Sequence, residues 1–214
     1  MDSGFNVMYR CLFEKDYVVG ADIDDKADLL VVAGFFARDG DYLSRVMLYE
    51  NRKLKKEIKI HGEQPYGVKL NEKGIFAVFE NSLRVYDLKG SEVLNYNFLY
   101  RKIHKLSLTS KYAAVVLSEK TLGTDDRILV FDGNGDILYD NIITIEIMDV
   151  KFSDDNKTLY FLARTGLYKI NIEQRTFEFV TDEYDETTDS IVYANENHIY
   201  LSGLTKINAV DAAE

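Results

Sequence analysis

The chain has 214 residues, and its hydrophobic content of 46% excludes an intrinsically disordered protein. The net charge of −10 argues against binding to nucleic acid and against binding to an anionic membrane surface, because both kinds of binding require clustered Lys and Arg on the protein. Cys11 is the only cysteine, so an internal disulfide and a four-cysteine zinc site are both excluded.

Short alternating or apolar runs, separated by Gly, Asn and Asp, follow one another along the whole chain. They are rich in β-branched and aromatic residues, which predicts β-strands, and no stretch predicts a helix of three turns. In chain order the clearest runs are 29–36 (LLVVAGFF), 75–80 (IFAVFE), 112–118 (YAAVVLS), 158–163 (TLYFLA) and 198–203 (HIYLSG). The sequence therefore predicts an all-β fold.

A second pattern repeats at a longer period. Five strands end in a large apolar residue followed by an acid or an amide, at Glu50, Asp87, Asp132, Asn171 and Asp211, with steps of 37, 45, 39 and 40 residues. A period near 40 residues with about four strands in each unit is typical of β-propeller blades. The strands that would line the central channel are predicted at 18–24, 66–72, 104–110, 148–154 and 189–195.

This period predicts one β-propeller domain over residues 1–214, with five four-stranded blades. The blades are expected at about 17–60, 66–98, 103–143, 147–182 and 189–211. The last blade stops after three strands, and an open edge leaves backbone groups unpaired. We therefore expect residues 5–13 (FNVMYRCLF) to supply its outer strand. The alternative is an open arc of a larger, truncated propeller.

The stretch FDGNGDILYD (131–140) alternates Asp132, Asn134 and Asp136 in the manner of a calcium loop. An EF-hand loop also needs Gly and Glu at two later positions, both of which hold Ile here. Gly133 and Gly135 suit the positive φ angles of a tight hairpin. We predict a turn between two strands rather than a metal site.

The second strand of each blade is expected to be buried on both faces, because neighbouring blades pack on either side of it. Its apolar side chains should therefore form the core. The residues concerned are Leu30, Val32, Phe36, Phe76, Val78, Val115, Leu117, Leu159 and Phe161.

The phrases VYDLKGSEVLNY, SKYAAVVLS, ILVFDGNGDILYD and GLYKIN resemble the repeats of bacterial WD40-like and quinoprotein-like propellers, especially a group known only as a domain of unknown function. The likeness is one of repeats and covers nearly the whole chain. Members of that group typically sit behind one N-terminal membrane helix and face outward. These 214 residues contain no such helix, so the compartment stays open between the cytoplasm and an extracytoplasmic domain cut from an anchor. WD40 repeats proper carry Gly-His and Trp-Asp pairs, and this chain has no Trp.

Candidate binding residues lie at the ends of the predicted inner strands and in the connections between blades. In a propeller these positions surround the mouth of the central channel, where loops can meet a partner. The predicted binding rim consists of Asp22, Asp24, Asp25, Gln64, Tyr66, Lys102, His104, Asp149, Glu183, Asp185, Glu186 and Asp189.

The leading functional hypothesis is a non-catalytic propeller that serves as a protein-binding or scaffolding module. No phosphate loop, Ser-His-Asp spacing or paired-His metal motif occurs, so we expect no catalytic residue, no metal and no cofactor. The expected partner is another protein, with no nucleic acid and no direct membrane contact. Two alternatives stay open. One is a glycosidase or lactonase-like hydrolase with Asp22 and Asp149 at the channel mouth, and the other is a carbohydrate-binding propeller.

Overall fold

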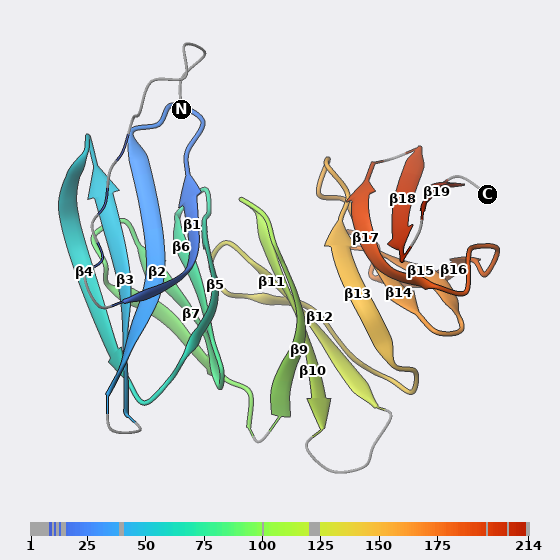
Figure 1. Ribbon diagram of the computed structural model, residues 1–214, viewed down its shortest axis with the longest axis horizontal. Helices are drawn as coiled ribbons and strands as arrows, with labels where there is room; N and C mark the ends of the chain where they lie inside the picture. Colours follow the sequence, from blue (N-terminus) through green and yellow to red (C-terminus); the bar gives the residue numbers. More distant parts are fainter. Residues whose placement is uncertain are drawn as a thin grey trace. The chain divides into compact units, whose positions relative to one another are not determined.

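The computed structural model describes residues 9, 11, 13, 16–38, 41–99, 101–119, 125–195, 197–204 and 206–212. Its regular structure consists of nineteen strands in five sheets, four of them four-stranded and one three-stranded (Figure 1). The predicted all-β fold is confirmed. In this described part of the chain, no helix has the length and apolar character needed to cross a membrane.

The described residues fall into two compact units, and the first contains two sheets. Each strand pairs antiparallel with the next along the chain, so both sheets are simple meanders. The first sheet comprises β1 (Tyr17–Ile23), β2 (Leu29–Arg38), β3 (Asp41–Glu50) and β4 (Lys53–His61). The second comprises β5 (Pro65–Leu70), β6 (Gly74–Phe79), β7 (Ser82–Asp87) and β8 (Glu92–Asn97).

The second unit contains three sheets with the same meander topology. The third sheet comprises β9 (Arg101–Leu108), β10 (Tyr112–Glu119), β11 (Asp126–Asp132) and β12 (Ile137–Ile143). The fourth comprises β13 (Ile147–Phe152), β14 (Thr158–Ala163), β15 (Gly166–Asn171) and β16 (Thr176–Thr181). The fifth comprises β17 (Thr188–Ala194), β18 (His198–Gly203) and β19 (Ile207–Asp211). The five clearest predicted strands thus coincide with β2, β6, β10, β14 and β18.

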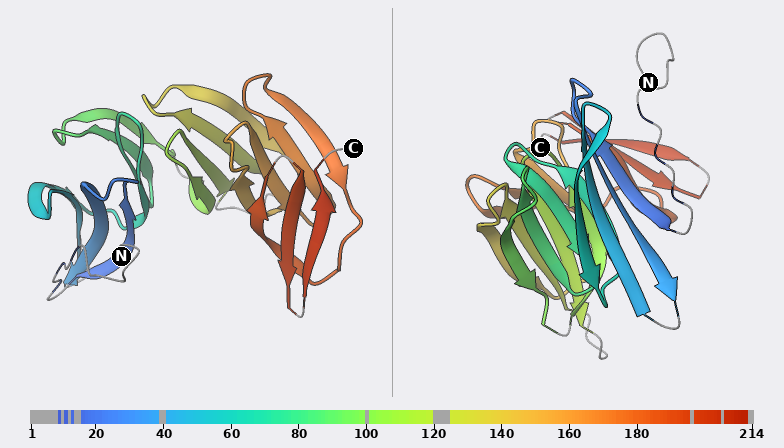
Figure 2. Two further views of the ribbon diagram at one scale, coloured as in Figure 1. Left: turned by 90° about the horizontal axis from the view of Figure 1, so that it is seen from above. Right: turned by 90° about the vertical axis from the view of Figure 1, so that its left-hand side faces the viewer.

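Neighbouring sheets inside each unit lie side by side (Figure 2). Apolar side chains fill the space between them. In the first unit, Val31 and Ile75 belong to one cluster that joins the two sheets. In the second unit, Ile128 and Phe161 belong to a cluster that joins the third and fourth sheets, and another cluster joins the fourth and fifth. Each sheet is therefore held by the apolar faces that its alternating sequence creates.

Most of the predicted core is confirmed. The buried members are Val32, Phe76, Val78, Val115, Leu117, Leu159 and Phe161. Leu30 and Phe36 are only half-buried. Both lie toward the ends of β2, on either side of its buried centre.

At three of its five positions, the recurring acid or amide at the end of the third strand caps the turn that follows it. The Asp87 Oδ1 accepts the backbone N–H of Ser91 at 2.8 Å, and the Asp132 Oδ1 accepts that of Asp136 at 2.9 Å. The Asn171 Oδ1 accepts the N–H three residues further on, at 2.8 Å. Such side-chain turns explain why Asp and Asn recur at this point of the repeat. They also confirm that FDGNGD is a hairpin turn.

A second set of capping residues lies in the turn between the first and second strands of every sheet. In each case a side-chain oxygen accepts a backbone N–H at or next to the start of the second strand, at 2.7–3.0 Å. The five residues are Asp24, Asn71, Thr109, Ser153 and Asn195. One capping residue in every repeat, and a second one in three of them, thus serve the fold itself.

The predicted outer strand of the last blade, 5–13, lies mainly outside the described residues. Only residues 9, 11 and 13 of it are described, and none of the three is in a strand. The Tyr9 hydroxyl donates to the carbonyls of Ala27 (3.0 Å) and Asp28 (2.9 Å), in the turn between β1 and β2. The pairing of this stretch with the last sheet therefore stays a prediction.

Candidate functional site

Asp22 and Asp149 each join one inner strand to the next. In the first unit, Asp22 on β1 accepts the backbone N–H of Leu70 on β5 at 2.9 Å and pairs with the Lys69 ammonium at 2.7 Å. In the second unit, Asp149 on β13 accepts the N–H of Ile191 on β17 at 2.8 Å. Both carboxylates therefore satisfy backbone donors that would otherwise be unpaired between sheets.

Two further side chains in the second unit also accept a backbone N–H group from a neighbouring sheet. Neither was among the residues predicted from the sequence. The Ser107 hydroxyl on β9 accepts the N–H of Phe152 at 3.3 Å. Asp126 on β11 accepts the N–H of Ile147 at 2.8 Å. Asp126 is almost fully buried, and this burial raises the pKa of its carboxyl group. Inter-sheet clamps of this kind account for several polar residues near the inner strands.

The predicted rim residues of the first unit lie at two different ends of its inner strands. β1 and β5 run side by side in the same direction, since Gly20 lies beside Val68 and Asp22 bonds to Leu70. Asp24 and Asp25 follow the C-terminal end of β1, whereas Gln64 and Tyr66 lie at the N-terminal end of β5. The structure therefore does not bring these four residues together, and Asp24 already caps its turn.

The acidic connection before β17 is anchored at its middle. The Tyr184 hydroxyl donates to the carbonyl of Ala163 at 2.9 Å. Asp185 pairs with the Lys206 ammonium at 2.9 Å, and this hydrogen bond, with others from Thr187, lowers the pKa of Asp185. Glu183 and Glu186 remain exposed on either side. The connection thus presents carboxylates on a fixed backbone.

A shallow cavity of about 470 Å³ lies beside the middle of β9 and the starts of β13 and β17. It is lined by His104, Lys105, Glu146, Met148, Asp189 and Ser190. Of the predicted rim, the structure brings His104 and Asp189 together here. Lys102, which is exposed on β9, precedes this group in sequence without lining the cavity. We call this cavity, together with its six lining residues, the rim cavity.

Four of these residues were not predicted from the sequence, although their positions in the repeat could have indicated them. The lining positions lie at or beside residues 104, 148 and 189, where three of the inner strands were predicted to begin. Glu146 accepts a hydrogen bond from the Arg164 guanidinium at 2.8 Å, which lowers the pKa of Glu146. The rim cavity therefore combines a fixed carboxylate with Lys105, His104 and the thioether of Met148.

The chemistry of the rim cavity suits binding. Among the described residues, no group of three or more His, Cys, Asp or Glu side chains could hold a metal ion. The lining offers both signs of charge, hydrogen-bonding groups and one apolar side chain, which together complement a polar surface of mixed charge.

Residues 7–210 match the sequence model of a family of unknown function, DUF5711. The chain belongs to the DUF5711 family. No curated protein matches this DUF5711 chain.

Several solved propellers are similar in structure to this DUF5711 protein. Hydrazine synthase of Kuenenia stuttgartiensis superposes with a TM-score of 0.62 at 14% identity, over 91% of this chain and 64% of that one. The Pan2 WD40 domain of Neurospora crassa gives 0.59 at 13% identity, over 92% and 63%. The Dos1 propeller gives 0.65 at 11% identity, over 100% and 61%. The DUF5711 chain thus has a propeller fold and spans less than two thirds of the length of each of these chains.

Proposed function

We propose that this DUF5711 protein is a non-catalytic propeller module that binds another protein through the rim cavity and the adjoining acidic connection. The observation that carries the proposal is the rim cavity itself. Its charged side chains come from three successive strands, and they are not the ones used to cap turns or to clamp neighbouring sheets. Side chains of this kind on a rigid scaffold are typical of interaction surfaces.

The hydrolase alternative relied on Asp22 and Asp149 as a catalytic pair. Each of these carboxylates accepts a backbone N–H from the neighbouring inner strand. A general acid or nucleophile needs an oxygen directed at substrate. A calcium-dependent rise in melting temperature that disappears in Asp22→Asn and Asp149→Asn would favour the hydrolase, and we expect no such rise.

The proposal can be tested by photo-crosslinking at single positions in the cells that produce the protein. A photoreactive amino acid at position 104 or 189 should give a discrete crosslinked product with one partner protein. The matched control carries the same group at position 53, on the exposed edge of β4. Because position 53 is also exposed, random encounters should label it as well.

The charge-reversed variant Lys105→Glu with Asp189→Lys should abolish the product from position 104. Circular dichroism should show that the variant remains folded. Identical crosslinking from positions 53 and 104, or a product that survives the charge reversal, would contradict binding at the rim cavity.

A further inference from the structure

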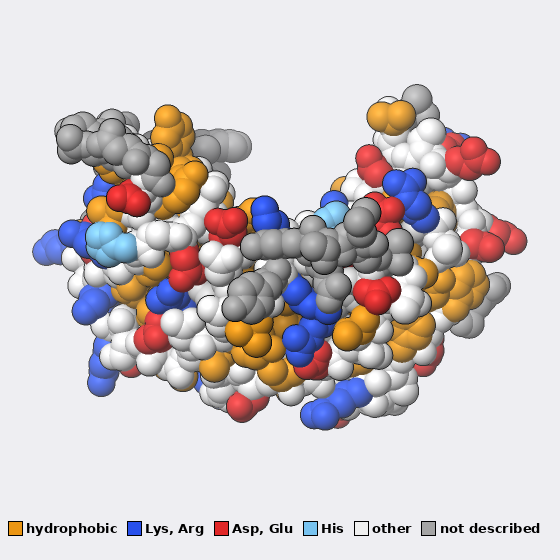
Figure 3. Space-filling view, turned by 90° about the horizontal axis from the view of Figure 1, so that it is seen from below, with side chains coloured by type: hydrophobic (Ala, Val, Ile, Leu, Met, Phe, Trp, Pro, Cys, Tyr) orange, Lys and Arg blue, Asp and Glu red, His pale blue; other side chains and the backbone are white. Residues whose placement is uncertain are grey.

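Strand β16 is the exposed edge of the fourth sheet. It pairs antiparallel with β15 on one side, and no strand of the described residues pairs with its other side. Two of its aromatic side chains are open to solvent, Phe177 at 44% and Phe179 at 53% exposure. Exposed apolar side chains occur in several places on the face shown in Figure 3, so exposure alone identifies no site. What distinguishes β16 is that its aromatic rings are packed against one another in a regular arrangement.

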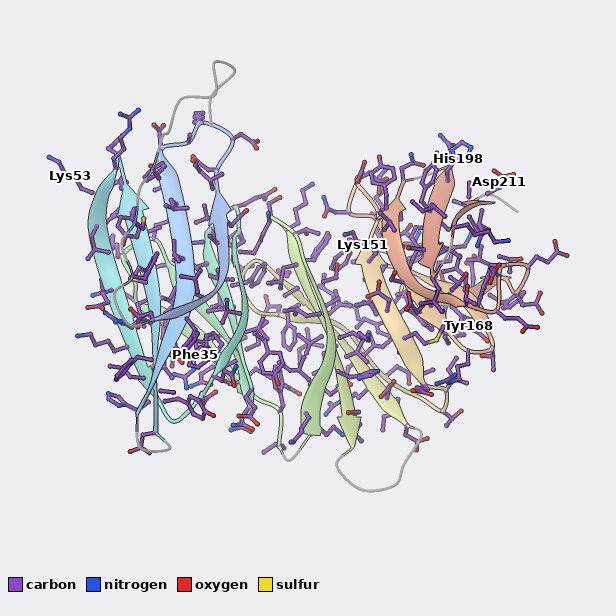
Figure 4. All side chains as sticks on the ribbon, viewed as in Figure 1. Phe35, Lys53, Lys151, Tyr168, His198 and Asp211 are labelled. Carbon is purple, nitrogen blue, oxygen red and sulfur yellow. The ribbon has the colours of Figure 1, made fainter. Side chains whose placement is uncertain are left out.

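The two exposed rings rest on a packed aromatic base. Tyr168 on β15, labelled in Figure 4, stacks on the fully buried Phe161 with ring centroids 5.2 Å apart and planes 8° apart. Phe177 stacks on Tyr168 at 5.4 Å, and Phe179 meets Tyr168 edge-on at 5.5 Å. Rings held in this way lose little conformational entropy when a partner covers them.

Gly166 makes room for this arrangement at the start of β15. Its φ of +151° lies outside the usual range of L-residues, and a Cβ atom there would come within 2.6 Å of the Phe179 ring. The absence of a side chain at Gly166 therefore lets Phe179 lie against the sheet. The aromatic surface of Tyr168, Phe177 and Phe179, which we name the β16 platform, is thus built by the backbone as well as by the rings.

The surroundings of β16 are acidic. The segment 176–189 contains no Lys or Arg, and Asp182 and Glu183 are exposed immediately after the strand. Glu178 pairs with Lys169 across the strands at 3.5 Å, on the opposite face from the platform. A partner that covers the platform would therefore meet uncompensated negative charge at the C-terminal end of β16.

We propose that β16 binds an extended peptide as a fifth, antiparallel strand, with alternate apolar side chains on the β16 platform and Lys or Arg beside Asp182 and Glu183. The free edge supplies backbone hydrogen bonds, the platform supplies apolar contact, and the acidic end selects charge. Because the added strand runs opposite to β16, its basic residues precede its apolar ones. The inference rests on the proposed protein-binding role, shares the acidic connection with it, and adds the free edge of β16 as a contact surface separate from the rim cavity.

The test uses a synthetic peptide in which a lysine stretch precedes alternating valine and threonine, with binding measured by fluorescence anisotropy. Phe177→Ala with Phe179→Ala should weaken binding by at least about tenfold. Leu54→Ala, an exposed apolar residue on the edge strand β4, is the matched control and should leave affinity unchanged. A peptide with alternate backbone nitrogens methylated should fail to bind, because it cannot complete the strand.

Charge reversal tests the acidic end separately. Asp182→Lys with Glu183→Lys should weaken binding at low salt, and the difference from the unmodified protein should shrink at high salt. Asp25→Lys with Glu72→Lys makes the same change of charge in the first unit and should have no effect. The same peptide with its lysines at the C-terminal end should bind more weakly.

Equal affinity for the methylated and unmethylated peptides would overturn strand addition. Failure of the lysine-first peptide to bind would overturn it as well. So would a concentration-dependent dimer, seen by sedimentation and lost in the Phe177→Ala/Phe179→Ala variant, because a second copy would then occupy the edge. These results are independent of crosslinking from position 104, so failure here leaves the rim cavity proposal standing, and the reverse also holds.

Discussion

The edge strands β4 and β16 occupy equivalent places in their sheets, yet their side chains differ completely. β4 carries Lys53, Lys55, Lys56 and Lys59, all exposed, and Lys53 extends away from the strand in Figure 4. β16 carries exposed Phe177 and Phe179 and a single charged residue, Glu178. Lysines on an edge strand discourage pairing with other strands, whereas an apolar edge invites it. The comparison shows that the same repeat can produce a protected edge and an open one.

The largest expected effect on stability distinguishes the buried ring of the aromatic cluster on the fourth sheet from an exposed one. Phe161→Ala should lower the free energy of unfolding by about 3–5 kcal/mol, because Phe161 is fully buried and leaves a cavity. Phe177→Ala should cost less than about 1.5 kcal/mol, since only the contact with its aromatic neighbours is lost. Urea unfolding measures both. Equal losses would show that Phe177 serves the core and not an open surface.

The inner strands of the first and fourth sheets should respond alike to mutation, whereas their edge strands, β4 and β16, differ. Asp22→Ala and Asp149→Ala should each cost about 1–3 kcal/mol, because each leaves a backbone N–H unpaired between sheets. The Asp→Asn variants keep an acceptor oxygen and should lose roughly half as much. Denaturant titration of the four variants provides the measurement. No loss in the Ala variants would show that these carboxylates are not clamps.

Removal of the protecting lysines should make β4 resemble β16. Lys53→Thr with Lys55→Thr should speed aggregation on warming, as followed by light scattering, because the charges that keep other strands away are gone. Phe177→Lys should slow aggregation by the converse reasoning. Unchanged scattering in both variants would mean that edge chemistry does not control association.

A small, pH-dependent effect is expected in the connection that follows β16. The hydrogen bond from Lys206 lowers the pKa of Asp185 below its ordinary value of about 3.9. The stabilisation is therefore fully present above about pH 4 and is lost as the pH falls toward the lowered pKa. Asp185→Asn should lower the melting temperature slightly at pH 7, and the difference should close in acid. Asp25→Asn serves as the matched exposed control.

The strands and turns could be predicted because the repeat constrains them locally. Short apolar or alternating runs rich in β-branched and aromatic residues identified β2, β6, β10, β14 and β18, and at three of its five positions the recurring acid or amide marked a capped turn. The predicted binding rim was less accessible to sequence reasoning. Asp22, Asp24 and Asp149 look like any other acidic residues in the sequence, but one oxygen of each carboxylate accepts a backbone N–H group.

The β16 platform was also beyond sequence reasoning, for a related reason. Phe177 and Phe179 alternate as core residues do, and an aromatic residue on a strand is more often buried than exposed. An outermost strand has fewer neighbours to cover its side chains, and whether a strand is outermost depends on the order of strands in the sheet, which local pattern does not specify. The edge position of β16 supplies that missing fact.

Backbone hydrogen exchange of β16, with and without the lysine-first peptide, tests the contrast between the two edges most directly. The free protein should exchange rapidly in both β4 and β16, because each has one unpaired side. Addition of the peptide should slow exchange in residues 176–181 and leave residues 53–61 unchanged. Protection that appears in β4 instead, or in neither strand, would contradict a docking edge at β16.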